Sequence, residues 1–242
     1  MAELLEAMGV KIQRTGQRID IDVPAEIDPV APYSLVERMR ASIVVLGPLL
    51  ARIGQARVAM PGGDDFGSRP IDMHLQGLEQ LGATFSYEHG DISGQADRLI
   101  GSEVSLEFPS VGATENLLMA SVLAEGVTVI ENAAREPEIT DLANFLSQMG
   151  AQIEGVGTSR LTIKGVETLT PVTYSVIPDR IEAATYLSAL AVCGGQIRLR
   201  GARPDHMEML LRKLEEMGRN LEEDDSGLRA EVTGRLEAVD VS

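Results

Sequence analysis

Three charged side chains on one glycine-rich stretch are the first candidates for chemistry in this sequence. Residues 60–74, MPGGDDFGSRPIDMH, carry the carboxylates Asp64 and Asp65 and the cation Arg69. The glycines and prolines oppose a regular helix or strand, so a surface loop is expected. Pro70 suits the first position of a helix, which would place Arg69 beside free N–H groups that attract anions. Such a loop would suit a lid over a phosphorylated substrate, although a solvated turn would have the same composition.

The elements that must position this loop recur at intervals of about 70 residues. Four helices are expected to end in a Leu-Gly or Met-Gly pair, because glycine is the usual residue just beyond a helix. A β-hairpin is expected after each of these helices. The glycines are Gly9, Gly82, Gly150 and Gly218, and the hairpins are Val10–Val23, Thr84–Gln95, Gln152–Lys164 and Asn220–Thr233.

The other half of the repeated unit is a helix followed by a short strand. Helices are expected over Leu35–Ile53, Ala113–Ala124 and Ile181–Val192, and strands over Arg57–Met60, Val127–Ile130 and Gln196–Arg200. A kink is expected at Gly47-Pro48 in the first of these helices. The complete unit is βαβαββ, with three nearly full copies and, over residues 1–28, the tail of an earlier one. Because a half-unit lacks core partners, the chain is expected to be a piece of a longer protein.

Composition narrows the class of partner. The 242 residues are 44% hydrophobic and only 3% aromatic, so a core of aliphatic side chains is expected. A formal charge of −16 argues against a nucleic-acid groove. No apolar run is long enough for a membrane span, and the acidic N-terminal segment is unlike a secretory signal. The single Cys193 fits a reducing compartment and is expected to lie in the core, and the three histidines are too scattered for a metal site.

Six motifs match one known family, and several of them are long and ungapped. They are MRAS at 39–42, PGGD…GSRPIDMH at 61–74, GLEQLGA at 77–83, SVGAT at 110–114, ENAAREPEI at 131–139 and PDRIE at 178–182. Together they resemble the UDP-N-acetylglucosamine enolpyruvyl transferases over nearly the whole chain. The resemblance implies an inside-out α-β prism built from βαβαββ repeats. It also implies transfer of enolpyruvyl from phosphoenolpyruvate to the 3′-hydroxyl of UDP-N-acetylglucosamine, the first committed step of peptidoglycan synthesis in the bacterial cytoplasm, without a metal or organic cofactor.

The resemblance also implies roles for individual residues. Asp64 stands where the family has its general acid, usually Cys and in some members Asp. Arg40 matches an arginine that contacts the UDP-sugar, and Arg69 also lies near the phosphoenolpyruvate phosphate in the family. The nucleotide-sugar segment corresponds to Arg69, Pro70, Ile71, Asp72 and Met73, and a loop that grips the diphosphate through backbone N–H groups corresponds to Ser110, Val111 and Gly112. Because a carboxylate attacks an epoxide far more slowly than a thiolate does, Asp64 predicts resistance to the epoxide antibiotic fosfomycin.

The register of this family divides the chain into four parts. Residues 1–28 are the tail of a truncated first repeat, and residues 29–108 are a second repeat with the active-site loop. Residues 109–178 are a third repeat with a linker, and residues 179–242 are the first repeat of a second domain. The family's Lys-Asn pair would precede Met1, and its catalytic aspartate and further phosphoenolpyruvate-binding arginines would follow Ser242. The chain alone is therefore expected to be inactive and to need the remaining part of the two-domain enzyme.

Two other functions remain open at this point. A sister enzyme that acts on shikimate 3-phosphate shares the repeat, although its motifs are not expected to include the PGGD and RPID of this loop. A non-catalytic protein of the same fold that binds sugar nucleotides would suit a chain without the catalytic half. Phe108 also departs from the family, because a lysine that contacts phosphate is often found at this position.

Structural roles are open for several single residues. An arginine recurs ahead of later helices, at Arg135 and Arg203, so the repeat alone leaves a structural role for such an arginine open. His74 without the family would be a partly exposed surface histidine. Glu136 and Glu138 flank a proline at a helix start, where carboxylates oppose the helix dipole favourably.

Overall fold

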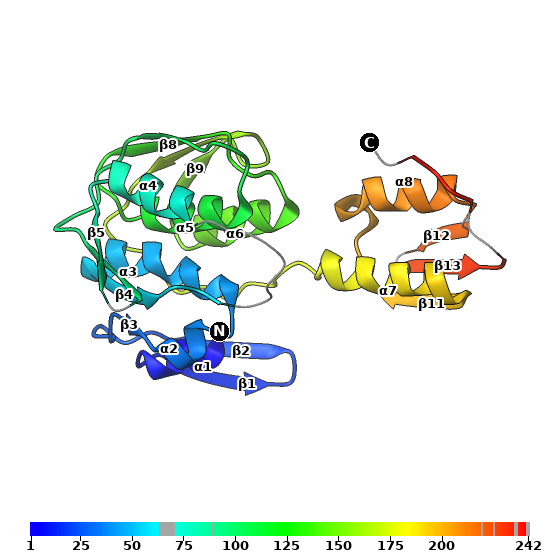
Figure 1. The fold of residues 1–242 in the computed structure, drawn as a ribbon, viewed down its shortest axis with the longest axis horizontal. Helices are drawn as coiled ribbons and strands as arrows, with labels where there is room; N and C mark the ends of the chain where they lie inside the picture. Colours follow the sequence, from blue (N-terminus) through cyan, green and yellow to red (C-terminus); the bar gives the residue numbers. More distant parts are fainter. Residues whose placement is uncertain (63–70, 89, 219, 225, 235–236, 241–242) are drawn as a thin grey trace. The chain divides into compact units, whose positions relative to one another are not determined.

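The chain divides after Tyr174 into two units, Met1–Tyr174 and Ser175–Ser242 (Figure 1). The computed structural model describes residues 1–62, 71–88, 90–218, 220–224, 226–234 and 237–240. Each unit has a hydrophobic core of its own. Among the described residues, the larger unit contains two four-stranded sheets and the hairpin of β1 (Lys11–Thr15) and β2 (Arg18–Asp22), whereas the smaller unit contains one three-stranded sheet.

The two four-stranded sheets share one topology. Their strand orders are β3-β4-β6-β5 and β7-β8-β10-β9. The strands are β3 Val30–Ala31, β4 Gln55–Ala59, β5 Thr84–Glu88, β6 Asp91–Gln95, β7 Glu103–Ser105, β8 Val127–Glu131, β9 Gln152–Glu154 and β10 Arg160–Lys164. In each sheet the first two strands are parallel and the other pairs are antiparallel. Because a parallel pair needs a crossover, a helical segment lies between those two strands, and the predicted βαβαββ unit is confirmed.

The helices of the larger unit connect these strands. They are α1 Ala2–Ala7, α2 Tyr33–Val36, the 3-10 helix η1 Arg40–Val45, α3 Leu46–Ile53, α4 Asp72–Gln80, α5 Val111–Ser121 and α6 Pro137–Gln148. Gly9, Gly82 and Gly150 follow helices with φ of 98°, 96° and 106°, which confirms the predicted helix ends. No helix in the described part of the chain is long and apolar enough to cross a membrane.

Two predicted helix boundaries are wrong. The single helix expected over Leu35–Ile53 is three pieces, α2, η1 and α3, and the break lies ahead of Gly47-Pro48. This proline sits in the first turn of α3, where its missing N–H would have had no helical partner, so no kink is needed there. Helix α4 begins at Asp72 with Ile71 as its N-cap, two residues after the predicted start at Pro70.

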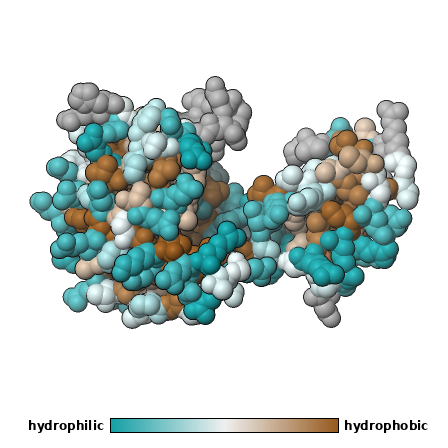
Figure 2. All heavy atoms as spheres, turned by 90° about the horizontal axis from the view of Figure 1, so that it is seen from below, coloured by the Kyte–Doolittle hydropathy of each residue, from teal (hydrophilic) through white to brown (hydrophobic). Residues whose placement is uncertain are grey.

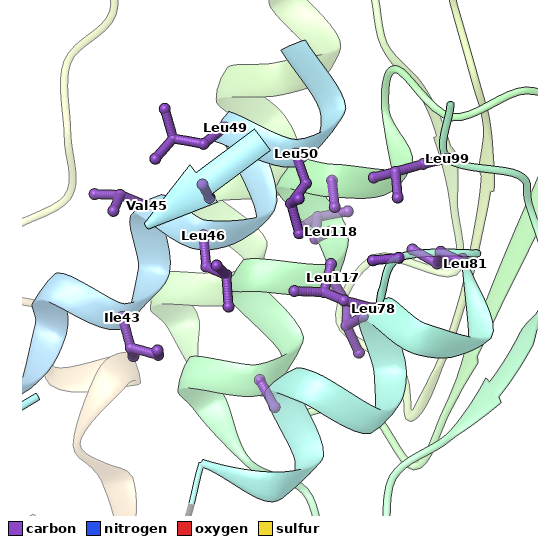
Figure 3. Packing of buried hydrophobic residues seen from close by; sticks show 14 of the residues in the cluster. Ile43, Val45, Leu46, Leu49, Leu50, Leu78, Leu81, Leu99, Leu117 and Leu118 are labelled. Atoms are coloured by element: carbon purple, nitrogen blue, oxygen red, sulfur yellow. The ribbon is translucent and has the colours of Figure 1, made fainter. Parts of the chain in front are cut away.

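Helix α5 lies between α3 and α4 at very short distance. A Cβ atom on Gly47 would lie 2.4 Å from the backbone oxygen of Asn116, and one on Gly77 would lie 2.7 Å from a methyl group of Leu117. Glycine is therefore needed where α3 and α4 meet α5. Around these contacts, buried leucines from the three helices converge (Figure 3), namely Leu46, Leu50, Leu78, Leu117 and Leu118.

The described residues of the smaller unit repeat the pattern without its first strand. Helix α7 (Arg180–Cys193) leads to β11 (Gly195–Arg200), and a 3-10 turn η2 (Pro204–His206) with α8 (Glu208–Glu216) leads to the hairpin of β12 (Asn220–Asp224) and β13 (Gly227–Val232). The sheet order is β11-β13-β12, all antiparallel. Cys193 is exposed, so its predicted place in the core is wrong. It ends α7 beside Val192, which is 86% exposed, on a part of the helix that the small core does not cover.

Candidate functional site

Three of the predicted site segments meet at the N-terminal end of α5. Arg40 opens η1, Ile71–Met73 are the N-cap and first two residues of α4, and Ser110–Gly112 are the N-cap and first two residues of α5. The ring of His74 joins them, because a Cβ atom on Gly112 would lie 3.2 Å from its Cε1 atom and the charge of Arg40 acts on it. The predicted residues Asp64, Asp65, Arg69 and Pro70 lie outside the described residues.

The N-terminus of α5 has the geometry of an anion site. The Oγ atom of Ser110 accepts a hydrogen bond from the backbone N–H of Ala113 at 3.4 Å, which caps the helix. The backbone N–H groups of Val111 and Gly112 belong to the first turn, where no helical carbonyl can accept from them. The helix dipole favours negative charge at the same place. Phosphate oxygens could therefore bind here through backbone groups alone.

Thr114 ties this end of α5 to the loop before α6. Its buried hydroxyl donates to the backbone oxygen of Ser110 at 2.8 Å and accepts the backbone N–H of Ala134 at 3.0 Å. Both the entry to α5 and the entry to α6 are thus held by one side chain. Glu136 is the N-cap of α6 and Glu138 lies in its first turn, as the sequence predicted.

His74 is buried, so its predicted exposure is wrong. Only 6% of the residue is exposed, because the close packing of α4 on α5 turns this face of α4 inward. Burial, followed by the positive charge of Arg40, lowers the pKa of His74 from 6.5 to about 4, so the ring is neutral near pH 7. The sequence held a signal for this burial, since His74, Leu78 and Leu81 share the i, i+4, i+7 spacing of a core face.

Asn116 is the site residue that the sequence analysis missed. It is fully buried, and its amide contacts three segments, at Gly47, Ile43 and His74. The available signal was its spacing, because Asn116 stands three residues after Ala113 and four before Ala120, on a core face where a buried amide must find hydrogen-bond partners.

Carboxylates lie at the side of the site that faces α6. Burial, followed by the negative charge of Glu138, raises the pKa of Glu115. These two groups do not amount to a metal site, and no cluster of three His, Cys, Asp or Glu side chains suited to a metal ion occurs among the described residues. The positive end of the α5 dipole lies at Ser110–Gly112, whereas Glu115, one turn further along the helix, and Glu138 of α6 add negative charge.

Residues 1–242 match the EPSP synthase (3-phosphoshikimate 1-carboxyvinyltransferase) family over their whole length. The chain belongs to the EPSP synthase family. Among curated relatives in this family, the UDP-N-acetylglucosamine 1-carboxyvinyltransferase of Solidesulfovibrio magneticus is 50% identical over 240 residues, and that of Desulfatibacillum aliphaticivorans is 48% identical over 238. The matches cover 99% and 98% of this chain but 58% and 57% of the relatives, so the chain spans little more than half their length.

Solved structures of an enolpyruvyl transferase and an EPSP synthase have the same fold. The enolpyruvyl transferase NikO from Streptomyces tendae matches with a TM-score of 0.81 at 24% identity, over 97% of this chain and 57% of that protein. EPSP synthase from Acinetobacter baumannii matches with a TM-score of 0.66 at 19% identity, over 100% of this chain and 57% of that protein. The predicted enolpyruvyl transferase fold, and the resemblance to UDP-N-acetylglucosamine enolpyruvyl transferases, are confirmed.

Proposed function

We propose that this chain is part of an enzyme that transfers the enolpyruvyl group of phosphoenolpyruvate to the 3′-hydroxyl of UDP-N-acetylglucosamine. The identity of 50% to a UDP-N-acetylglucosamine 1-carboxyvinyltransferase carries the proposal. Identity to the EPSP synthase of Acinetobacter baumannii is 19%, which favours the nucleotide sugar over shikimate 3-phosphate. The reaction would be the first committed step of peptidoglycan synthesis in the cytoplasm, without a metal or organic cofactor.

The nucleotide sugar would bind at the N-terminal end of α5. Its diphosphate needs hydrogen-bond donors and positive charge, and the first-turn N–H groups of α5 and the guanidinium of Arg40 offer both in an otherwise acidic chain. The proposed contacts are Arg40, Arg69, Pro70, Ile71, Asp72, Met73, Ser110, Val111 and Gly112. The position of His74 supports the proposal, because its ring belongs to α4, lies against Gly112 of α5 and is affected by the charge of Arg40.

Chemical-shift mapping tests this site directly. UDP-N-acetylglucosamine titrated into the labelled 242-residue chain should perturb the amides of Arg40, Ile71–Met73 and Ser110–Gly112. Only one wall of a two-domain cleft would be present, so the affinity should be millimolar or weaker. Shikimate 3-phosphate and free N-acetylglucosamine are the control ligands. Perturbations that avoid these segments, or that shikimate 3-phosphate alone produces, would contradict the assignment.

Asp64 would be the general acid that protonates the methylene carbon of phosphoenolpyruvate. A free Asp has a pKa of about 3.9, so its neighbour Asp65, the anionic substrates and loop closure would have to raise that value. In the complete enzyme, Asp64→Cys should stay active and become sensitive to fosfomycin, whereas Asp64→Asn should be nearly inactive. Rates with and without fosfomycin measure this. Inactivation of the Asp64 protein by a covalent adduct, or near-normal turnover of the Asn variant, would refute the role.

The four-part division by repeats is also a proposal, with one refinement. Strand β7 pairs with β8, which supports placing Glu103–Ser105 at the start of the third repeat rather than at the end of the second. The catalytic aspartate and further arginines would come from the remaining part of the enzyme. Residues 1–242 alone should therefore release no phosphate from phosphoenolpyruvate and UDP-N-acetylglucosamine. Loss of the aspartate that acts as base, and loss of the arginines that stabilise the phosphate charge, each lower the rate by orders of magnitude. Turnover of a few per second would contradict this.

A further inference from the structure

We propose that Asn116 is a positioning residue of the nucleotide-sugar site, and that it acts by holding His74 as a hydrogen-bond donor beside Gly112. The inference rests on the proposed function for its ligand, but the contacts that carry it are independent of that ligand. Asn116 itself is fully buried and would touch no substrate.

The orientation of the Asn116 amide is fixed by its neighbours. The backbone N–H of Gly47 lies 2.7 Å from Oδ1, and because this group can only donate, the atom it faces must be the amide oxygen. The nitrogen Nδ2 then donates to the backbone oxygen of Ile43 at 3.1 Å and lies 3.0 Å from Nδ1 of His74. Every polar atom of this side chain is therefore committed.

The same contacts select one tautomer of His74. Since Nδ2 of Asn116 carries hydrogens, Nδ1 of the ring must accept, and the proton of the neutral ring must be on Nε2. That atom lies 3.4 Å from the position of a Cβ atom on Gly112. His74 thus directs a neutral N–H group to the first turn of α5, where backbone N–H groups already favour an anion.

The surroundings of the ring preserve this state near neutral pH. Among the described residues, Arg40 of η1 is the charged group that acts on the ring, while α5 presents the uncharged Asn116 and Gly112. A proton on Nδ1 would face the hydrogens of the amide. The Asn116 amide also ties α3 and η1 to α5, so it sets the spacing between the segment of Arg40 and the diphosphate-binding turn.

The variant Asn116→Asp reverses the hydrogen-bonding sense at the ring with little change of shape. One carboxylate oxygen still accepts from Gly47, but the other faces Nδ1 of His74 as an acceptor. The proton of the neutral ring should therefore move to Nδ1, and the pKa of His74 should rise. Long-range ¹H–¹⁵N spectra of the 242-residue chain report both quantities. A wild-type ring with its proton on Nδ1 would overturn the inference even if the variant does not fold.

Binding of UDP-N-acetylglucosamine at different pH values distinguishes a positioning role of Asn116 from a purely structural role. The wild-type affinity should be constant from pH 6 to 8. In Asn116→Asp the affinity at pH 8 should fall about fivefold. It should recover as the pH drops and the ring regains its proton on Nε2. Glu115→Gln, on the same helix, is the matched control and should keep the wild-type profile. A loss of affinity that is equal at every pH, or no loss, would overturn the positioning role.

The two proposals fail in different ways. If the nucleotide sugar leaves Arg40 and Ser110–Gly112 of the wild type unperturbed, the proposed function fails, whatever the tautomer. If the wild type binds at these segments but the tautomer is unchanged by Asn116→Asp, the positioning role fails and the proposed function stands.

Discussion

Helices α5 and α7 occupy the same position of the repeat in the two units, yet they differ in burial. Helix α5 has no continuous polar face, and most of its side chains are buried in the core of the larger unit. Helix α7 is almost as apolar but buries only Ala183, Leu187 and Leu190, and it leaves Ile181, Tyr186 and Val192 exposed. Figure 2 shows hydrophobic residues at the surface of residues 175–242. A helix without a polar face is normally buried, so α7 has the sequence of a central helix but is only partly covered in the described chain.

The sheets of the two units also differ, because the sheet of the smaller unit has fewer strands. Each sheet of the larger unit has a parallel first strand, β3 or β7, in front of the antiparallel strands. The described residues of the smaller unit provide no counterpart, and its sheet has three strands. One repeat thus forms its local elements alone, but burial of its central helix depends on adjacent repeats.

The largest expected effect is a difference in stability between the two units. Residues 175–242 should unfold before residues 1–174, with a gap on the order of 5 kcal/mol, because a unit of this size with a small core is marginal. Native-state hydrogen exchange measures this, with amides of β13 compared against amides of β8. Equal protection of the two strands would contradict the comparison.

The close contact of α3 with α5 should make Gly47→Ala strongly destabilising. The added Cβ atom would lie 2.4 Å from both the backbone oxygen and Oδ1 of Asn116, and the backbone cannot move aside. A loss of roughly 3 kcal/mol or more is expected for the larger unit alone, measured by chemical denaturation.

Gly112→Ala is the matched control for this clash. Its Cβ atom would meet only side-chain atoms of His74, at 3.2 Å and 3.4 Å, and alanine suits a helix better than glycine. The change in the free energy of unfolding should stay within about 1 kcal/mol. Equal losses for the two variants would show that α3 can shift away from α5.

His74 should make the larger unit sensitive to acid. Its pKa is lowered to about 4 in the folded state, so the unfolded chain takes up a proton first as the pH falls below about 6.5. The larger unit should lose stability between pH 6.5 and 4, by up to about 3 kcal/mol. Denaturation at several pH values measures the slope, and in His74→Gln this part of the slope should disappear. An unchanged slope in that variant would exclude His74 as its source.

The sequence predictions succeeded where a structural feature depends on residues that are close together in the chain. Helix ends at Gly9, Gly82 and Gly150 were predictable because a positive φ after a helix is a local demand that glycine meets. The hairpins and the resemblance to the family were equally local, since contiguous motifs carry them.

The failures involve contacts between distant segments. The helix expected over Leu35–Ile53 is broken around Ile43, whose backbone oxygen accepts from Nδ2 of Asn116 across 73 residues. His74 is buried for a similar reason, because α4 packs on α5. Cys193 was expected in a core that the described chain does not build. Of the site, Arg40 and the start of α5 could be named from motifs, whereas the Asn116–His74 pair needed the packing.

The smallest expected effect is at Tyr174, where the larger unit ends. Its hydroxyl donates to Oδ1 of Asp141 at 2.7 Å, and its ring packs against Phe145 with centroids 5.1 Å apart. Tyr174→Phe keeps the ring contact and loses the hydrogen bond, so the larger unit should lose about 1 kcal/mol. Tyr87→Phe is the matched control, because Tyr87 is 66% exposed, and it should leave the stability unchanged.

The stability of the larger unit at alkaline pH gives a second test of the Tyr174 hydrogen bond. Burial, followed by the hydrogen bond to Asp141 and its negative charge, raises the pKa of Tyr174 from 10.0 to about 12. A raised pKa means that the unfolded chain releases the proton first, so the contribution of Tyr174 is complete below about pH 10 and is lost as the pH rises towards 12. Wild type and Tyr174→Phe should therefore converge in stability over this range. A difference that persists at pH 12 would mean that the hydroxyl acts through packing rather than through its proton.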